Sequence, residues 1–175
     1  MIEGKLTNLR ALEREDLKQL RDWRNDPDLR SVFREYRLLN MILQERWFES
    51  LHKKNPPDNL MFGIVDRKNK LIGVTGLTYI NWKNRNAELS FYLGDRRGNT
   101  AIEDDAVQMI LDYGFNELSL HRIWVEVYEF NERTIKMLER NGFKKEGTIR
   151  HAVWRERKWW NSYLYSMLQS EFSKR

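Results

Sequence analysis

The chain has 175 residues, of which 41% are hydrophobic and 33% are charged, and its formal net charge at pH 7 is +5. This length fits one domain with a sizeable core, because domains usually span roughly 100–200 residues. The composition is too apolar for a disordered chain and too charged for a membrane protein. We therefore expect a single domain over residues 1–175 with one functional site.

Several protein classes are excluded by what the sequence lacks. No stretch reaches the ~20 apolar residues of a spanning helix, and residues 1–5 lack the apolar core of a signal peptide. The sequence has no cysteine, and its histidines, His52, His121 and His151, lie far apart. Disulfides, thiolate metal ligands and cysteine nucleophiles are therefore ruled out. We predict a cytoplasmic protein with no membrane segment and no metal.

The basic residues of the chain are mixed with acidic ones. This is clearest near the N-terminus, in the series Glu13, Arg14, Glu15, Asp16, Arg21, Asp22, Arg24, Asp26, Asp28 and Arg30. Alternating charge is typical of solvated helix faces, whereas a nucleic-acid-binding surface gathers Lys and Arg together. The pattern argues against nucleic acid as a partner, while a mildly basic surface suits a small polyanionic ligand.

The first half of the chain alternates predicted strands and helices. Residues 6–12 have the apolar, β-permissive character of a strand, and a helix that opens at Glu15 should end before Pro27. A second helix is predicted at about 43–52. Three strands then follow, at residues 60–65, 71–80 and 87–93. The polar turn at 66–70 joins the first two of these strands into an antiparallel hairpin.

The second half begins with the clearest helix of the chain, at residues 104–118, where apolar residues recur at helical spacing. A strand at 122–128 alternates apolar and polar residues. Asn131 is predicted to cap a short helix that ends at Asn141 and Gly142 in a left-handed C-cap. Two long strands, at 143–154 and 159–168, then form a final hairpin.

The connection between strand 87–93 and helix 104–118 is a candidate anion site. Backbone N–H groups in a polar loop favour anions such as pyrophosphate, and so does the dipole of the following helix. An ordinary strand-to-helix connection has the same sequence character. This segment alone therefore leaves both interpretations open.

Three motifs downstream of this loop favour the ligand site. They are His-Arg-Ile-Trp-Val-Glu-Val at 121–127, Asn-Glu-Arg-Thr-Ile at 131–135, and Leu-Glu-Arg-Asn-Gly-Phe-Lys-Lys-Glu-Gly at 138–147. Together they closely resemble the strand, the Asn-led helix and the E-x-x-G-F-x-x-E-G segment of the RimJ/RimL-like branch of the GNAT superfamily of acyl-CoA-dependent N-acyltransferases. Shorter matches extend the resemblance to both ends of the chain, at 9–12, 15–17, 23–27, 72–73, 85–89 and 165–168.

The resemblance implies a GNAT fold of mixed α/β class. Its central sheet is mostly antiparallel, twisted and splayed, with six to seven strands flanked by about four helices. Acetyl-CoA is the implied co-substrate, lying in the splay, and no metal is implied. The residues expected to contact acetyl-CoA are Phe91, Tyr92 and Leu93 through their main chain, Arg96, Arg97, Gly98, Asn99, Thr100, Ala101 and Ile102 around the pyrophosphate, and Asn131 and Arg133.

One part of this loop departs from the family pattern. The family usually has a glycine-rich Q/R-x-x-G-x-G/A loop, whereas here Ala101 and Glu103 stand where the two later small residues should be. Glycine lets the backbone approach the ligand, and a carboxylate at Glu103 would repel a pyrophosphate if it pointed inward. An outward orientation of Glu103, or a shifted loop register, would remove the conflict.

The implied reaction is transfer of an acetyl group to a primary amine by direct attack in a ternary complex. The amine must lose a proton before it attacks, and a carboxylate is the usual acceptor. Glu88 is the candidate general base, because the family often carries a base on this strand. The alternative is that Glu88 faces solvent or pairs with Arg85 or Lys83.

The leaving thiolate needs a different group. Many GNAT enzymes protonate it with a tyrosine at the position of Leu138 in this chain. A hydroxyl such as that of Ser90 or Thr134 could stabilise it, or the thiolate could leave directly. Glu129 and Tyr128 are further candidates that one sequence does not rank.

The acceptor is expected to be a small-molecule amine or a protein N-terminus, and the basic surface slightly disfavours polycations. The resemblance places Arg24, Asn25 and Tyr36 over the acceptor site. Trp82 could stack on the substrate, although tryptophans in a small sheet protein mostly pack in the core. Homodimers are common in the family. The rival interpretation is a non-catalytic GNAT-fold binding or regulatory module with weak or no CoA binding, motivated by the altered loop and by Leu138.

Overall fold

The computed structural model describes residues 1–95 and 99–172. In this part of the chain, eight strands form one sheet in the order β1-β2-β3-β4-β5-β6-β8-β7. Every neighbouring pair is antiparallel except β5 and β6, which are parallel. The strands are β1 (Ile2–Glu3), β2 (Asn8–Ala11), β3 (Leu60–Val65), β4 (Leu71–Asn81), β5 (Asn86–Leu93), β6 (Arg122–Tyr128), β7 (Lys144–Arg155) and β8 (Lys158–Leu168).

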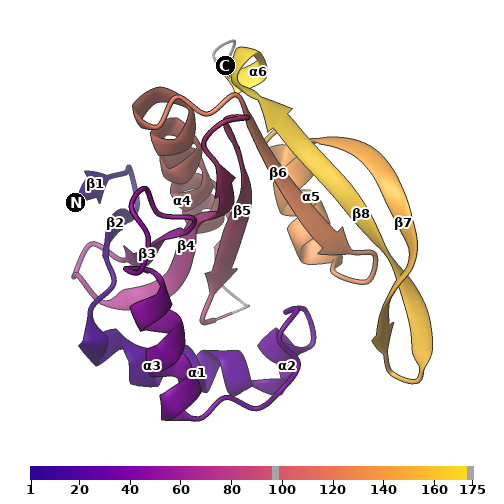
Figure 1. Cartoon of the computed structure of the whole chain (residues 1–175), viewed down its shortest axis with the longest axis horizontal. Coiled ribbons are helices and arrows are strands. Elements are labelled where there is room, and N and C mark those ends of the chain that lie inside the picture. The colour runs from indigo at the N-terminus through magenta and orange to yellow at the C-terminus, as the bar shows by residue number, and fades with distance from the viewer. Residues whose placement is uncertain (96–98, 173–175) are drawn as a thin grey trace.

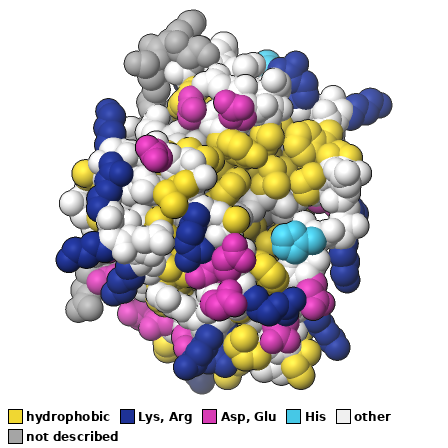
Figure 2. All heavy atoms as spheres, turned by 90° about the vertical axis from the view of Figure 1, so that its left-hand side faces the viewer, with side chains coloured by type: hydrophobic (Ala, Val, Ile, Leu, Met, Phe, Trp, Pro, Cys, Tyr) yellow, Lys and Arg dark blue, Asp and Glu magenta, His cyan; other side chains and the backbone are white. Residues whose placement is uncertain are grey.

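Helices pack on both faces of this sheet (Figure 1). They are α1 (Leu17–Asn25), α2 (Pro27–Arg30), α3 (Met41–Ser50), α4 (Thr100–Asp112), α5 (Glu132–Arg140) and α6 (Gln169–Phe172). A 3-10 turn at Arg14–Asp16 precedes α1, and a π-helical segment at Tyr113–Glu117 continues α4. On the face drawn in Figure 2, Lys and Arg side chains are interspersed with Asp and Glu, as the alternating charge of the sequence predicts.

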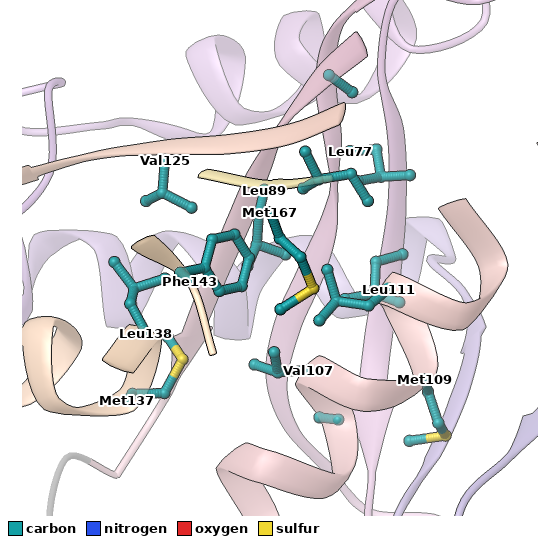
Figure 3. Packing of buried hydrophobic residues seen from close by; sticks show 14 of the residues in the cluster. Leu77, Leu89, Val107, Met109, Leu111, Val125, Met137, Leu138, Phe143 and Met167 are labelled. Carbon is teal, nitrogen blue, oxygen red and sulfur yellow. The ribbon is translucent and has the colours of Figure 1, made fainter. Parts of the chain in front are cut away.

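Two hydrophobic cores form because successive residues of a strand point to opposite faces. The larger core lies between the sheet and helices α4 and α5, and Leu89 of β5 points into it. Figure 3 shows Phe143 between Leu138 and Met167 in this core. The smaller core lies on the other face, where Tyr92 of β5 packs with residues of α1 and α3. Strand β5 is thus held from both sides.

The predicted fold class is confirmed, with differences in detail. Strands β3 and β6 have the predicted bounds. The sheet has eight strands in the described residues, not six to seven, because the two-residue β1 pairs with β2. Helix α4 begins at Thr100, earlier than predicted, because the Asn99 side chain accepts a hydrogen bond from the N–H of Ala101 and caps it. The short helices α2 and α6 lack the length that gives a periodic signal.

The predicted left-handed C-cap of α5 is confirmed. Gly142 has φ 80°, a region that glycine enters without a Cβ clash. The N–H of Gly142 donates to the oxygen of Glu139 at 2.9 Å, and the N–H of Phe143 donates to that of Leu138 at 3.0 Å. This cap turns the chain so that Phe143 enters the larger core.

Strands β5 and β6 separate partway along their length. Their parallel pairing covers Asn86 to Glu88 on β5 and ends there in the described residues. Beyond Glu88, β5 stays paired with β4 as far as Leu93, while β6 stays paired with β8 as far as Tyr128. The two strands therefore diverge toward their C-terminal ends (Figure 1). This divergence confirms the predicted splay.

Asp105 of α4 binds residues 5–7 of the N-terminal segment by hydrogen bonds and so holds this segment against α4. Its carboxylate accepts hydrogen bonds from the N–H groups of Lys5, Leu6 and Thr7 at 2.8–2.9 Å and from the Thr7 hydroxyl at 2.9 Å. Burial opposes ionisation of this carboxyl. The hydrogen bonds outweigh burial, however, and lower the pKa of Asp105 below its ordinary value of 3.8.

Replacing Asp105 by Asn is expected to lower the free energy of unfolding by about 1.5–3 kcal/mol near neutral pH, because charge-assisted hydrogen bonds are lost. The folded-state pKa lies below the unfolded one. The contribution is therefore complete above the ordinary pKa and is lost as the pH falls through the folded value. Denaturant titrations of both proteins at neutral and acidic pH measure the difference, which should shrink in acid.

Asp112→Asn is the matched control on the same helix, because that exposed carboxylate accepts one hydrogen bond, from Asn116. We expect this control to change the unfolding free energy by less than about 0.5 kcal/mol. An Asp105→Asn difference that does not change with pH would contradict the assigned role of the carboxylate.

Candidate active site

A cavity of about 580 Å³ lies where β5 and β6 diverge. Its walls come from both strands, from α1 and α3, from the loop at residues 31–40, and from α5. Because α1 and α3 pack on one face of the sheet and α5 on the other, the cavity joins the two faces through the splay. Two ligands can therefore enter the cavity from opposite faces of the sheet and meet inside it.

One edge of β5 faces this opening. The N–H of Gly94 donates to the oxygen of Ile72 at 2.9 Å, which directs the main chain of Gly94 toward β4. The oxygen of Ser90 also points toward β4, where the Thr75 hydroxyl donates to it at 3.0 Å. Tyr92 lies between these two positions. Because the main-chain groups of successive strand residues alternate in direction, those of Tyr92 also point toward β4. The intervening residues direct their N–H and C=O groups toward the opening; these are Leu89, Phe91 and Leu93.

Glu88 lies at the point where the two strands part. Its side chain is 7% exposed and forms a bidentate ion pair with Arg34. Nη1 of Arg34 donates to Oε2 at 2.7 Å, and Nη2 donates to Oε1. The hydrogen bonds from Arg34 to Glu88 raise the pKa of the Arg34 guanidinium above its ordinary value, although burial opposes this.

The predicted alternatives for Glu88 are both wrong. The side chain is buried, so it does not face solvent. Its ion-pair partner among the described residues is Arg34, and neither Arg85 nor Lys83; Nε of Arg85 donates instead to the oxygen of Ser119 at 2.7 Å. Arg34 lies 54 residues away in sequence, in a segment with no periodic pattern. No local signal in the sequence links it to Glu88.

A second carboxylate, Glu126 of β6, faces the same arginine. Its Oε2 lies 3.4 Å from Nη2 of Arg34, and its Oε1 accepts a hydrogen bond from the Ser162 hydroxyl at 2.6 Å. Tyr128, two residues further along β6, also lines the cavity. Burial raises the pKa of the Tyr128 hydroxyl, although Arg155 and Arg34 oppose the shift. Glu88 and Glu126 thus converge from the two diverging strands.

Glu103, the residue that departs from the family loop, points inward. It is 4% exposed and lines the cavity. Its Oε1 accepts a hydrogen bond from Nε of Arg133 at 2.6 Å, and Oε2 lies 3.4 Å from Nη2 of Arg140. Two arginines of α5 therefore offset the charge that would repel a pyrophosphate. Of the two arrangements left open by the sequence, an outward orientation of Glu103 is therefore excluded.

Asn131 precedes α5 and is buried against the cavity. The predicted capping hydrogen bond is absent, since its side chain makes none at the start of α5. Its Oδ1 has no hydrogen-bond partner among the described residues. A buried acceptor without a donor costs free energy, and such groups usually mark a site for a ligand or a water.

The other predicted ligand contacts are divided between the cavity and its surroundings. Ser90, Thr134 and Leu138 line the cavity together with Phe91 and Leu93. Arg96, Arg97 and Gly98 lie outside the described residues. The remaining loop positions are not in the wall of the cavity: Asn99, Thr100 and Ala101 are exposed at the start of α4, and Ile102 packs against the larger core.

The predicted acceptor residues are also divided. Arg24 lines the cavity, with its guanidinium 4.2 Å from the centre of the Phe33 ring and its buried Nε without a hydrogen-bond partner. Burial lowers the pKa of Arg24. The other three residues, Asn25, Tyr36 and Trp82, lie outside the cavity wall. The Asn25 amide exchanges two hydrogen bonds with the main chain of Leu39, and Tyr36 is exposed. Nε1 of Trp82 donates to the oxygen of Pro57 at 2.9 Å.

Within residues 1–95 and 99–172, no helix is long and apolar enough to cross a membrane. Nor do three or more His, Cys, Asp or Glu side chains gather there in a group that could hold a metal ion.

A family model described as an acetyltransferase (GNAT) domain matches residues 7–144. The spermidine N(1)-acetyltransferase of Vibrio cholerae is 28% identical over 171 residues, which cover 95% of each chain. A crystal structure of the V. cholerae spermidine N-acetyltransferase with CoA and spermine superposes with a TM-score of 0.88 at 25% identity, covering 96% of this chain and 98% of that one. An uncharacterized N-acetyltransferase, p20, of Bacillus licheniformis is 33% identical over 110 residues, or 63% of this chain and 62% of that relative.

Proposed function

Since the chain belongs to the GNAT family of acetyltransferases and is an acetyl-CoA-dependent N-acetyltransferase, we propose that it acetylates a small primary amine bound beside Glu88. The observation that carries the proposal is the buried carboxylate of Glu88 in the cavity, at the point where β5 and β6 part. The V. cholerae relative, solved with CoA and spermine, supports the pairing of an amine with CoA on this fold.

The cavity offers suitable groups for acetyl-CoA, which supplies the acetyl thioester. Main-chain groups of Phe91 and Leu93 face the opening and can bond to the pantetheine arm. The unpaired Oδ1 of Asn131 can accept a hydrogen bond from an amide N–H of that arm. Arg133, which lines the cavity, and the exposed start of α4 are the proposed diphosphate contacts, since a guanidinium can donate hydrogen bonds to a phosphate and helix N-termini favour anions. Arg96, Arg97 and Gly98 belong to the same proposal.

The proposed chemistry follows from these positions. Glu88 accepts a proton from the ammonium of the acceptor, which frees the nitrogen lone pair. The nitrogen attacks the thioester carbon, an amide C–N bond forms, and the C–S bond breaks. The sulfur leaves as the thiolate of CoA and takes up the second proton, which the nitrogen releases as the amide forms. The hydroxyls of Ser90 and Thr134, which line the cavity, are the proposed groups that stabilise the thiolate.

The charge of the cavity wall favours an acceptor with a single positive charge. Among the described residues its acidic members are Glu35, Glu88, Glu103 and Glu126, and its basic members are Arg24, Arg34, Arg37 and Arg133. Each glutamate already has an arginine within 4 Å. Glu35, for example, is bound by Arg37, which lowers the pKa of Glu35 to about 2. A polyamine needs a surplus of negative charge, which this wall does not supply.

The test is an assay of CoA release with three kinds of acceptor: small monoamines, spermidine, and a peptide with a free N-terminus. We expect kcat/KM to be highest for a small monoamine. If kcat/KM were highest for the peptide, the acceptor would be a protein N-terminus and not a small amine. A preference for spermidine would contradict the charge argument and leave the relatives' substrate as the better assignment.

Four further assignments belong to this proposal. Membership of the RimJ/RimL-like branch is supported by the motifs at 131–135 and 138–147. Homodimerisation is supported by the exposed outer edge of β7, which ends the sheet and pairs with no further strand among the described residues. A single domain over residues 1–175 is supported by the continuous sheet, which runs from β1 at one edge to β7 at the other. A cytoplasmic location is supported by the absence of cysteine.

A further inference from the structure

The loop at residues 31–40 lies between α2 and α3 and contributes Arg34 to the cavity. The Arg34 side chain is 46% exposed, whereas that of Glu88 is 7% exposed. The arginine therefore reaches a buried carboxylate from the solvent side. It is well placed to block the approach of any other cation to Glu88.

Two carboxylates from different strands meet this one cation. Glu88 of β5 binds both terminal nitrogens of Arg34, and Glu126 of β6 lies 3.4 Å from one of them. A pair of converging carboxylates is also what an ammonium group requires, because each N–H of the ammonium can donate to one oxygen. The guanidinium of Arg34 therefore stands where a substrate ammonium would bind.

The loop is anchored to neighbouring elements near its two ends, and between these anchors Glu35 and Arg37 pair with each other. Near one end, Nη2 of Arg155 donates to the oxygen of Phe33 at 3.1 Å. At the other end, the Asn25 amide exchanges two hydrogen bonds with the main chain of Leu39, both at 2.8 Å. Arg34 lies between these anchors on a long, flexible stem. Its side chain can turn into solvent without unfolding a helix or a strand.

We propose that Arg34 is a specificity-determining residue, which occupies the ammonium subsite made by Glu88 and Glu126 and withdraws when an acceptor amine binds. This inference rests on the proposed function. While Arg34 is in place, both oxygens of Glu88 are engaged, so the carboxylate is not available to take a proton from the amine. The binding of the acceptor amine and the release of Glu88 from Arg34 then occur in the same step. Arg34 also cancels charge that would otherwise attract polycations.

Steady-state kinetics of Arg34→Ala test this inference. Removing the competing cation should lower the KM of the best monoamine about five- to tenfold. This factor corresponds to a subsite that Arg34 leaves open in only about 10–20% of the wild-type molecules. The ratio of kcat/KM for spermidine to that for the monoamine should rise about tenfold, because both carboxylates are freed. Arg34→Gln keeps most of the stem and should behave like Arg34→Ala. Arg30→Ala removes a nearby arginine outside the cavity wall and should leave both values within about twofold.

Other results would overturn the inference. An unchanged KM in Arg34→Ala means that Arg34 does not compete with the acceptor. A lower kcat with unchanged KM means that Arg34 supports Glu88 instead of blocking it. Calorimetric titration of the monoamine into the CoA-bound protein measures the same competition without turnover, and it decides the question even if no CoA is released. Absence of turnover in the wild type with every amine tested would count against the proposed function and not against Arg34.

Discussion

Replacing Glu88 by Gln is expected to lower kcat by about 10²–10⁴-fold while acetyl-CoA affinity changes by less than about twofold. Gln is nearly the same size as Glu but does not accept a proton from the amine. The main-chain and Asn131 contacts proposed for the cofactor do not involve the Glu88 side chain. Steady-state kinetics and calorimetric titration with acetyl-CoA measure the two effects separately.

Glu126→Gln is the matched control for this substitution. It removes the other carboxylate that faces Arg34, from β6 instead of β5. Because Glu126 is proposed to bind the ammonium and not to take its proton, its loss should raise the KM of the amine and leave kcat within about threefold. Equal losses of kcat in the two variants, or full activity in Glu88→Gln, would remove Glu88 from the role of base.

Replacing Phe143 by Ala is expected to lower the free energy of unfolding by about 3–5 kcal/mol. Phe143 is 4% exposed and packs in the larger core, where it lies between Leu138 and Met167 (Figure 3). Truncation leaves a cavity under the wall that α5 contributes to the site. Denaturant titration measures the loss, and acetyl-CoA titration should show weaker binding because Asn131 is carried at the start of the same helix.

Phe143→Leu is the matched control, because it removes the aromatic ring but little of the side-chain volume. A leucine retains most of the buried apolar volume, so this variant should lose less than about 1.5 kcal/mol. A loss below about 1 kcal/mol in Phe143→Ala would contradict the packing described for this core.

The order of strands and helices could be predicted well because each has a local signal. Strand β6 alternates Ile123, Val125 and Val127 toward the larger core, and its bounds agree with the pattern. Gly142 marks the end of α5 through a conformation that glycine favours. The pattern is weaker where elements are short, so β1 and α2 are not visible in the sequence.

The candidate site was less predictable, because its pairings join residues that are distant in sequence. Arg34 and Glu88 are 54 residues apart, and Arg133 and Glu103 are 30 apart. A sequence shows that a charged residue is present but not which partner a long side chain will reach. It therefore left open whether Glu103 points inward, and the answer depends on where α5 packs against α4. The unpaired oxygen of Asn131 likewise becomes visible only once the fold closes around it.

Isothermal titration of the purified chain with acetyl-CoA, followed by measurement of CoA release on adding a primary amine, tests directly whether the cavity binds acetyl-CoA and transfers its acetyl group. We predict saturable binding of one acetyl-CoA per chain, weakened by Asn131→Ala, and amine-dependent release of CoA that Glu88→Gln slows by about 10²–10⁴-fold. Absence of binding heat together with absence of CoA release would contradict the assignment of this chain as an acetyltransferase. The non-catalytic GNAT-fold module would then be the better description of this chain.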